Sequence, residues 1–173
     1  EPEGAGLYAG GYGTEERPYQ ISNETEFSRI RENPASNFVL INDITWQDEK
    51  SGAAPMLPIP SFSGVLDGNG YTLSGWWQKQ NNVGNIGLFS ENTGKIKNLK
   101  IKDFVITNNG YEIYGTLCVG ALCGSNLKDG EIEDIYVSGC SLDTYVGTLS
   151  TDKNNYIGSG ILVGYNEGTI RRV

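Results

Sequence analysis

The sequence contains no histidine, and that absence excludes more chemistry than any other feature of its composition. Ser-His-Asp and Cys-His catalysis, the H-E-x-x-H zinc peptidase motif and every His-ligated metal site require this residue. EF-hand loops and nine-residue Gly/Asp calcium repeats are also absent from the sequence. We therefore predict no metal and no cofactor.

Basic residues and long apolar runs are scarce as well. The 13 Lys and Arg residues stand against 21 Asp and Glu, which gives a net charge of −8. We expect no nucleic-acid partner, because phosphate binding depends on basic side chains. No apolar run approaches the roughly 18 residues of a membrane helix, so we predict no membrane-spanning segment. The chain opens at Glu1 without a signal-peptide pattern, which fits either a cytoplasmic protein or a mature form.

The three cysteines are an odd number, so at least one is unpaired or pairs between chains. Cys118 and Cys123 lie in a Gly-rich apolar stretch, where a free cysteine behaves as a small buried hydrophobe. The pattern leaves the redox state of these two residues and of Cys140 open.

One helix is predicted, near the N-terminus. Asn23 can cap it, and Glu26 can reach back to that residue as in a capping box. Phe27 and Ile30 share one face of the helix, and Pro34 ends the segment after two or three turns.

After Pro34 the sequence consists of short apolar segments between Gly/Asn turns, which indicates an all-β protein. Phe38–Ile41 is predicted to be a buried strand. Asp67–Gly70 is predicted to be a turn, because Gly and Asn tolerate positive φ. Residues 47–60 hold three of the six prolines and are predicted to form a loop.

A motif recurs near residues 87–99, 120–135 and 160–173. Each copy has an apolar pair, a tight turn with Asn and Gly, and then a strand. A single copy cannot bury its apolar face, but copies stacked about 4.8 Å apart make a continuous core. The recurring Asn92, Asn126 and Asn166 can then hydrogen-bond from copy to copy, so we predict a structural amide ladder.

These copies resemble the GLUG motif of bacterial surface and secreted proteins, which include the non-catalytic regions of immunoglobulin-A-cleaving metallopeptidases. Ser90 departs from the motif where Gly124 and Gly164 carry the usual glycine. The resemblance implies a right-handed parallel β-helix of the pectin-lyase-like type, with one short N-terminal helix. Residues 1–34 would form an N-terminal segment with a capping helix and residues 35–173 the β-helix, as one folding unit.

The resemblance also implies an extracellular or cell-surface location. It favours a non-enzymatic structural or adhesion module that binds a glycan or a host or bacterial surface protein. Two alternatives remain: a polysaccharide-active β-helix enzyme, either a lyase or a glycosidase, and a non-catalytic domain of a larger secreted hydrolase. For an enzyme we considered the carboxylates Asp43, Asp67, Glu131, Glu133 and Asp134. Turn and surface roles account for these residues, so we assign no catalytic residue.

Trp76 and Trp77 are the predicted ligand-binding residues, because an exposed indole can stack on a sugar ring. Neighbouring side chains on a strand face opposite ways, so one indole can be buried while the other is exposed. The alternative is that residues 78–85 cover the outer tryptophan.

The last repeat stops within an apparent strand at Val173. We expect either that Val173 packs in a last coil or that the natural chain continues.

Overall fold

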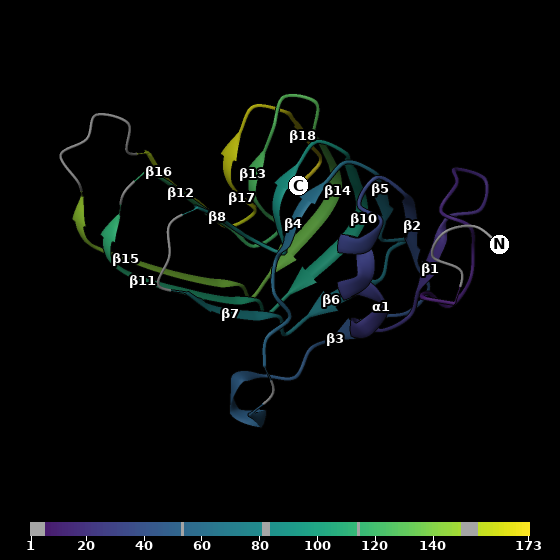
Figure 1. The fold of residues 1–173 in the computed structure, drawn as a ribbon, viewed down its shortest axis with the longest axis horizontal. Coiled ribbons are helices and arrows are strands. Elements are labelled where there is room, and N and C mark those ends of the chain that lie inside the picture. Colours follow the sequence, from purple (N-terminus) through teal and green to yellow (C-terminus); the bar gives the residue numbers. More distant parts are fainter. Residues whose placement is uncertain (1–5, 53, 81–83, 114, 150–155) are drawn as a thin grey trace.

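The computed structural model describes residues 6–52, 54–80, 84–113, 115–149 and 156–173. These residues form short strands and one short α-helix, which confirms the predicted all-β class (Figure 1). Every pairing between named strands in the described residues is parallel, and an isolated antiparallel bridge joins Gly10 to Gln20. None of the helices in the described part of the chain is long and apolar enough to cross a membrane.

The strands make four sheets. The first sheet has eight strands: β1 (Tyr19–Ile21), β2 (Asn37–Leu40), β3 (Ile44–Thr45), β5 (Val65–Asp67), β6 (Thr72–Ser74), β10 (Lys95–Lys102), β14 (Glu131–Ser138) and β18 (Thr169–Arg171). The second sheet has three: β7 (Trp77–Gln80), β11 (Val105–Ile113) and β15 (Ser141–Leu149). The third also has three: β8 (Gly84–Ile86), β12 (Thr116–Gly120) and β16 (Tyr156–Gly160). The fourth has four: β4 (Ile59–Phe62), β9 (Phe89–Asn92), β13 (Cys123–Asn126) and β17 (Val163–Asn166).

From β5 onward the chain visits these sheets in a fixed order. It passes through the first, second, third and fourth sheets and then returns to the first. Each strand pairs with the equivalent strand of the previous passage, so that Lys95 lies between Val65 and Glu131. Figure 1 shows this arrangement most clearly for β7, β11 and β15, which lie side by side. Equivalent residues therefore lie directly above one another, about 4.8 Å apart.

In β10, buried and exposed side chains do not alternate strictly, and a residue with left-handed backbone conformation explains why. Asn98 has a φ of 53°, and this bend turns Ile96, Leu99 and Ile101 all toward the core. Asp134 and Arg172, which follow paired positions in β14 and β18, have φ values of 54° and 51°. Asn and Asp adopt this conformation more readily than most residues, so the interruption at Asn98 marks a bend and not the end of the strand.

Asp67 supports this bend from the preceding strand. Its Oδ1 accepts hydrogen bonds from the backbone N–H of Asn69 at 2.8 Å and from the side chain of Asn98 at 3.1 Å. Its Oδ2 lies 3.2 Å from the Lys97 ammonium. Partial burial alone would raise the pKa of the Asp67 carboxyl, but the hydrogen bonds from Asn69, Asn98 and Lys97 lower it overall.

The N-terminal helix packs on the aromatic part of the core. α1 (Glu24–Ser28) continues into the 3₁₀ turn η1 (Arg29–Glu32). Asn23 caps α1 by accepting from the Glu26 backbone N–H at 3.0 Å, as predicted. The predicted return contact is wrong by one residue, because the Glu26 carboxylate accepts from the Ser22 N–H at 2.6 Å and not from Asn23. Phe27 is fully buried, and its ring packs against those of Trp46 and Phe89.

Close approach of the third and fourth sheets explains the glycines of the repeat. A Cβ on Gly124 would lie 2.6 Å from the Ile86 nitrogen in β8, and one on Gly164 would clash with the Val119 nitrogen in β12. Ser90 occupies the equivalent position one coil earlier. Since β8 is the first strand of the third sheet in the described residues, no earlier strand of that sheet lies where Ser90 needs room.

The three repeat asparagines form a continuous chain of hydrogen bonds. The Asn92 side-chain amide donates to Asn126 Oδ1 at 2.8 Å, and the Asn126 amide donates to Asn166 Oδ1 at 2.8 Å. Each amide also donates to a backbone carbonyl in its own turn, that of Gly94, Gly130 or Gly168. Asn92 and Asn126 are fully buried, whereas Asn166 is exposed at the last coil.

The last described strand is β18, which pairs with β14. Val173 follows the left-handed Arg172 as Ile135 follows Asp134, and the Ile135 N–H donates to the Arg172 carbonyl at 3.2 Å. Packing of Val173 in a last coil, one of the two expectations stated for it, is not observed, because the residue is 63% exposed.

Removal of the central asparagine, Asn126, is predicted to lower the free energy of unfolding more than removal of the last one, Asn166. Asn126→Ala removes the partner of one N–H of the buried Asn92 amide and of the buried Gly130 carbonyl, so we expect a loss of about 2–3 kcal/mol in the free energy of unfolding. Asn166→Ala is the matched control, with an expected loss of about 1 kcal/mol or less. Urea denaturation of the two variants measures the difference, and equal losses would contradict the ladder's role.

The charge on Asp67 is predicted to stabilise the protein in a pH-dependent way. Because folding lowers its pKa, this contribution is complete above the unfolded pKa of about 3.9 and disappears as the pH falls through the lowered folded value. We expect Asp67→Asn to cost up to about 1 kcal/mol at pH 7, since the carboxylate is partly exposed and solvent screens its ion pair with Lys97. Urea denaturation across this pH range should show the difference shrinking toward low pH, with the exposed Asp129→Asn as control. A difference that stays constant would contradict the assignment.

Candidate functional site

The structure holds a pocket between α1 and the segment that links β3 to β4. Before β5 the chain makes a shorter first passage, in which residues 46–58 run directly from β3 of the first sheet to β4 of the fourth. The described residues of this segment contain no strand of the second or third sheet. The pocket has a volume of about 320 Å³ and is called here the tryptophan pocket. It is lined by Glu24, Thr25, Ser28, Trp46, Gln47, Ala54, Pro55, Met56, Trp76 and Trp77.

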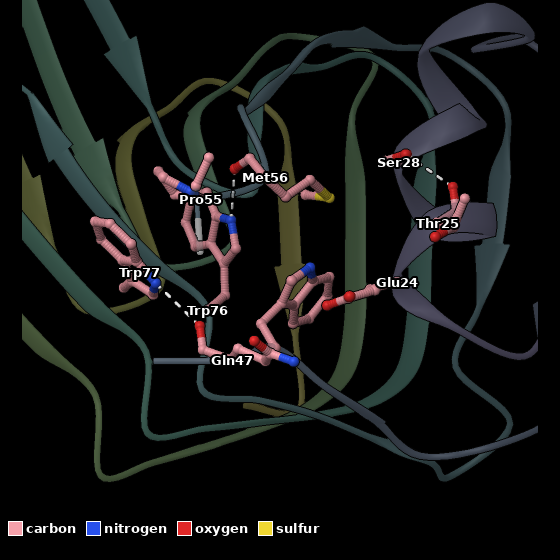
Figure 2. A pocket seen from close by; sticks show the side chains of 10 residues that line it. Glu24, Thr25, Ser28, Gln47, Pro55, Met56, Trp76 and Trp77 are labelled. Carbon is pink, nitrogen blue, oxygen red and sulfur yellow. Dashed lines mark hydrogen bonds between the residues drawn. The ribbon is translucent and has the colours of Figure 1, made fainter. Parts of the chain in front are cut away.

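Two indole groups hold the linking segment against the second sheet. Trp76 Nε1 donates to the Met56 carbonyl at 2.9 Å, and Trp77 Nε1 donates to the Gln47 carbonyl at 3.0 Å (Figure 2). The Gln78 side chain adds a second hydrogen bond to the Met56 carbonyl, at 2.6 Å. These contacts join both ends of the segment to β7 and the residue before it, and so give the pocket a defined wall.

The opposite wall comes from α1. Figure 2 shows Glu24 extending from the helix toward the tryptophans, with Thr25 and Ser28 on the same side of the pocket. The Ser28 hydroxyl donates to the Thr25 carbonyl at 2.7 Å, so its proton is already engaged. Glu24 is the one carboxylate among the residues that line the pocket.

The third indole, that of Trp46, differs from the other two. Trp46 is only 6% exposed, and its Nε1 is buried without a hydrogen-bond partner. Leaving such a donor unpaired costs about 1–3 kcal/mol, so its presence in the wall of a cavity needs a reason. The Trp46 ring itself is held by edge contacts with Phe27 and Phe104.

The two tryptophans predicted to bind a ligand both line this pocket, but they are exposed to different extents. Trp76 has no solvent-accessible surface and packs against Phe104, so its ring belongs to the core. Trp77 faces the other way and is partly exposed. Residues 81–83 of the segment predicted to cover the outer tryptophan lie outside the described residues, and the hydrogen bond of Trp77 is to Gln47.

Sequence reasoning missed Trp46, Glu24 and Met56 as parts of one site. The place of Trp46 in the fold explains why it belongs to the site. β3 pairs with β6, and Thr45 lies opposite Ser74. Trp46 and the Gly75-Trp76 pair therefore follow equivalent strands in neighbouring coils. No local pattern places Glu24 or Met56 there, since both reach the pocket through tertiary packing.

The carboxylates considered for catalysis lie elsewhere. Asp43 accepts from the Thr72 backbone N–H at 2.7 Å, which is a turn contact. Glu131 and Glu133 flank Lys95, whose ammonium lies 3.4 Å and 2.6 Å from them. The hydrogen bond from Lys95 lowers the pKa of Glu133, and the hydrogen bond from Arg172 lowers that of Asp134. A glycosidase general acid needs a raised pKa, so these shifts run in the opposite direction.

A second pocket, of about 490 Å³, lies between the third and fourth sheets. Asn85, Glu91 and Ser125 form its polar centre: Asn85 donates to Glu91 at 2.8 Å, and the Ser125 hydroxyl donates to Asn85 at 2.9 Å. Cys118 lines the same pocket, and burial raises the pKa of its thiol. The polar groups of this centre bond to one another.

Cys118 and Cys123 are buried and free, and Cys140 is free and partly buried. Burial raises the pKa of all three thiols, most of all that of the fully buried Cys123. The first two residues therefore pack as small hydrophobes, as predicted.

No protein-family model matches the chain. A sequence relative is a protein of Evansella cellulosilytica named "Putative Gly-rich membrane protein", which is 31% identical over 141 residues. The match covers 76% of this chain but spans only 16% of the relative's length.

A solved structure similar to this chain is the "Crystal structure of a putative immunoglobulin A1 protease from Bacteroides ovatus". The superposition covers 97% of this chain and 79% of that one, with 16% sequence identity and a TM-score of 0.33. Because this TM-score is low, the likeness carries no argument about fold or activity. The chain is thus similar in sequence to one segment of a longer Gly-rich protein.

Proposed function

We propose that this chain is a non-enzymatic, ligand-binding module of an extracellular or cell-surface protein. The observation that carries the proposal is the tryptophan pocket, whose aromatic wall is built by contacts between distant parts of the chain. Aromatic-lined concave pockets with a few polar groups are typical of small-molecule sites. A glycan is the proposed ligand, because an indole face stacks on a sugar ring.

The scaffold in this proposal is a right-handed parallel β-helix. The repeated order of four parallel sheets supports a solenoid, and parallel crossovers are right-handed in about 98% of cases. Residues 1–34 would form its N-terminal cap and residues 35–173 the stack, as one folding unit. The packing of Phe27 against Trp46 and Phe89 supports the single unit.

Binding is favoured over cleavage by the number of carboxylates at the site. Glycoside hydrolysis typically uses a pair of carboxyl groups about 5–9.5 Å apart, whereas Glu24 alone lines the tryptophan pocket. The surface location is supported by the name of the relative, a Gly-rich membrane protein, and by the resemblance of the repeats to the GLUG motif. Adhesion to a host or bacterial surface would be the consequence of glycan binding in that location.

Substitution of the partly exposed tryptophan is predicted to abolish glycan binding. We expect the wild-type protein to bind a subset of glycans on an array and Trp77→Ala to bind them at least tenfold more weakly, because the indole face is lost. Tyr136→Ala removes an aromatic side chain that is 65% exposed and does not line this pocket, so it is the matched control. Titration calorimetry with the best glycan measures the change in affinity.

Circular dichroism must show that Trp77→Ala remains folded, since this variant also loses the hydrogen bond to Gln47. Equal binding by Trp77→Ala and the wild type would remove the tryptophan pocket from the proposal. The absence of any glycan binding by the wild-type protein would reject the glycan-binding function itself.

A further inference from the structure

We infer that the tryptophan pocket takes an uncharged sugar ring, one oxygen of which accepts a hydrogen bond from Trp46 Nε1. This inference rests on the proposed function and adds the ligand class and the recognising atom. It starts from the difference between the three indoles of the pocket: two donate to loop carbonyls, and the third is buried in the wall with no partner.

The unpaired N–H of Trp46 favours a ligand that carries a hydrogen-bond acceptor. Three tryptophans and one carboxylate could in principle surround a quaternary ammonium ion, as aromatic cages do. Such a cation has no hydrogen-bond acceptor and would leave Trp46 Nε1 buried and unpaired. A hydroxyl or ring oxygen of a sugar is an acceptor, and a sugar hydroxyl can also donate to the Glu24 carboxylate across the pocket.

The charges around the pocket disfavour acidic ligands. Glu24 contributes a negative charge, and no Lys or Arg is among the lining residues. Arg31, three residues after the lining residue Ser28, is engaged elsewhere, because its guanidinium donates to the carbonyls of Ser28 and Leu57 at 2.8 Å each. An acidic sugar would therefore meet a carboxylate with no lining cation to offset it.

The size of the pocket limits the ligand to a small one. Its volume of about 320 Å³ lies at the lower end of the range of ligand pockets, which is about 300–1,000 Å³. We therefore expect recognition of one sugar ring, with any remaining chain outside the pocket.

The test uses the whole chain and simple probes. Protein-observed NMR and calorimetry are run with the methyl glycosides of glucose, galactose, mannose and N-acetylglucosamine as neutral probes. Methyl glucuronide is the acidic probe and choline the cationic one. The Trp46 indole N–H resonance, assigned by its loss in Trp46→Phe, reports directly on the proposed hydrogen bond.

Trp46→Phe keeps an aromatic ring and removes only the donor and part of the indole. We expect it to weaken binding of the best neutral glycoside at least tenfold and to lower the unfolding temperature less than Trp76→Phe does, because both changes shrink a buried ring but only Trp76→Phe also removes a hydrogen bond within the protein. Trp76→Phe makes the same chemical change at an indole that already has a partner, so it should lower the unfolding temperature.

Each result supports or overturns the inference. A shift of the Trp46 resonance with a neutral glycoside, together with the loss in Trp46→Phe, supports it. An unmoved resonance, equal binding by Trp46→Phe, or tighter binding of glucuronide or choline overturns it while leaving a ligand-binding function. A fall in unfolding temperature in Trp46→Phe as large as in Trp76→Phe would show that Trp46 has a structural partner, and also overturns it. If no probe and no array glycan binds the wild type, the proposed function fails instead.

Discussion

The structure depends on the parallel, in-register pairing of equivalent residues in successive passages of the chain. A side chain in this stack has a copy of its own position above and below it, so its hydrogen bonds can be completed only if those copies carry a suitable residue. Asn126 meets this condition, because it lies between Asn92 and Asn166 and bonds to both, and Asn92 and Asn126 are fully buried. The same constraint places the left-handed residues Asn98 and Asp134 at equivalent points of β10 and β14, between the pairs Lys97–Glu133 and Leu99–Ile135.

Much of the regular part could be predicted from the sequence, because a repeated motif reports directly on a repeated structure. Local residue types and spacing predict the all-β class, the helix cap at Asn23 and the recurrence of the asparagines. The break at Asn98 was visible as an irregular pattern, and the structure explains it as a bend that keeps Leu99 inside. The contact from Glu26 to Ser22 could not be predicted, since it depends on how the chain enters the helix.

The candidate site was predictable only in part. Trp76 and Trp77 stand out as neighbours in the sequence, and both line the pocket. Their roles differ because neighbouring side chains of an extended chain face opposite ways, so that Trp76 enters the core while Trp77 bonds to the linking segment. The position of residues 46–58 is set by hydrogen bonds to indoles some 20–30 residues away, and no local pattern encodes such contacts.

The pocket forms where the stack is least regular. In the later passages strands of the second and third sheets lie along the chain between those of the first and fourth, and Asn85 of the third sheet bonds to Glu91 and Ser125 of the fourth. In the first passage a proline-containing segment takes their place, and one buried donor is left without a protein partner. The interruption of the repeat thus creates both the cavity and the group that would recognise a ligand.

The most direct test is a crystal structure of the chain grown with a saturating neutral methyl glycoside. Our account predicts a sugar ring in the tryptophan pocket, with one of its oxygens within hydrogen-bonding distance of Trp46 Nε1. A pocket without sugar, in which an ordered water or a protein oxygen accepts from Trp46 Nε1, would contradict it.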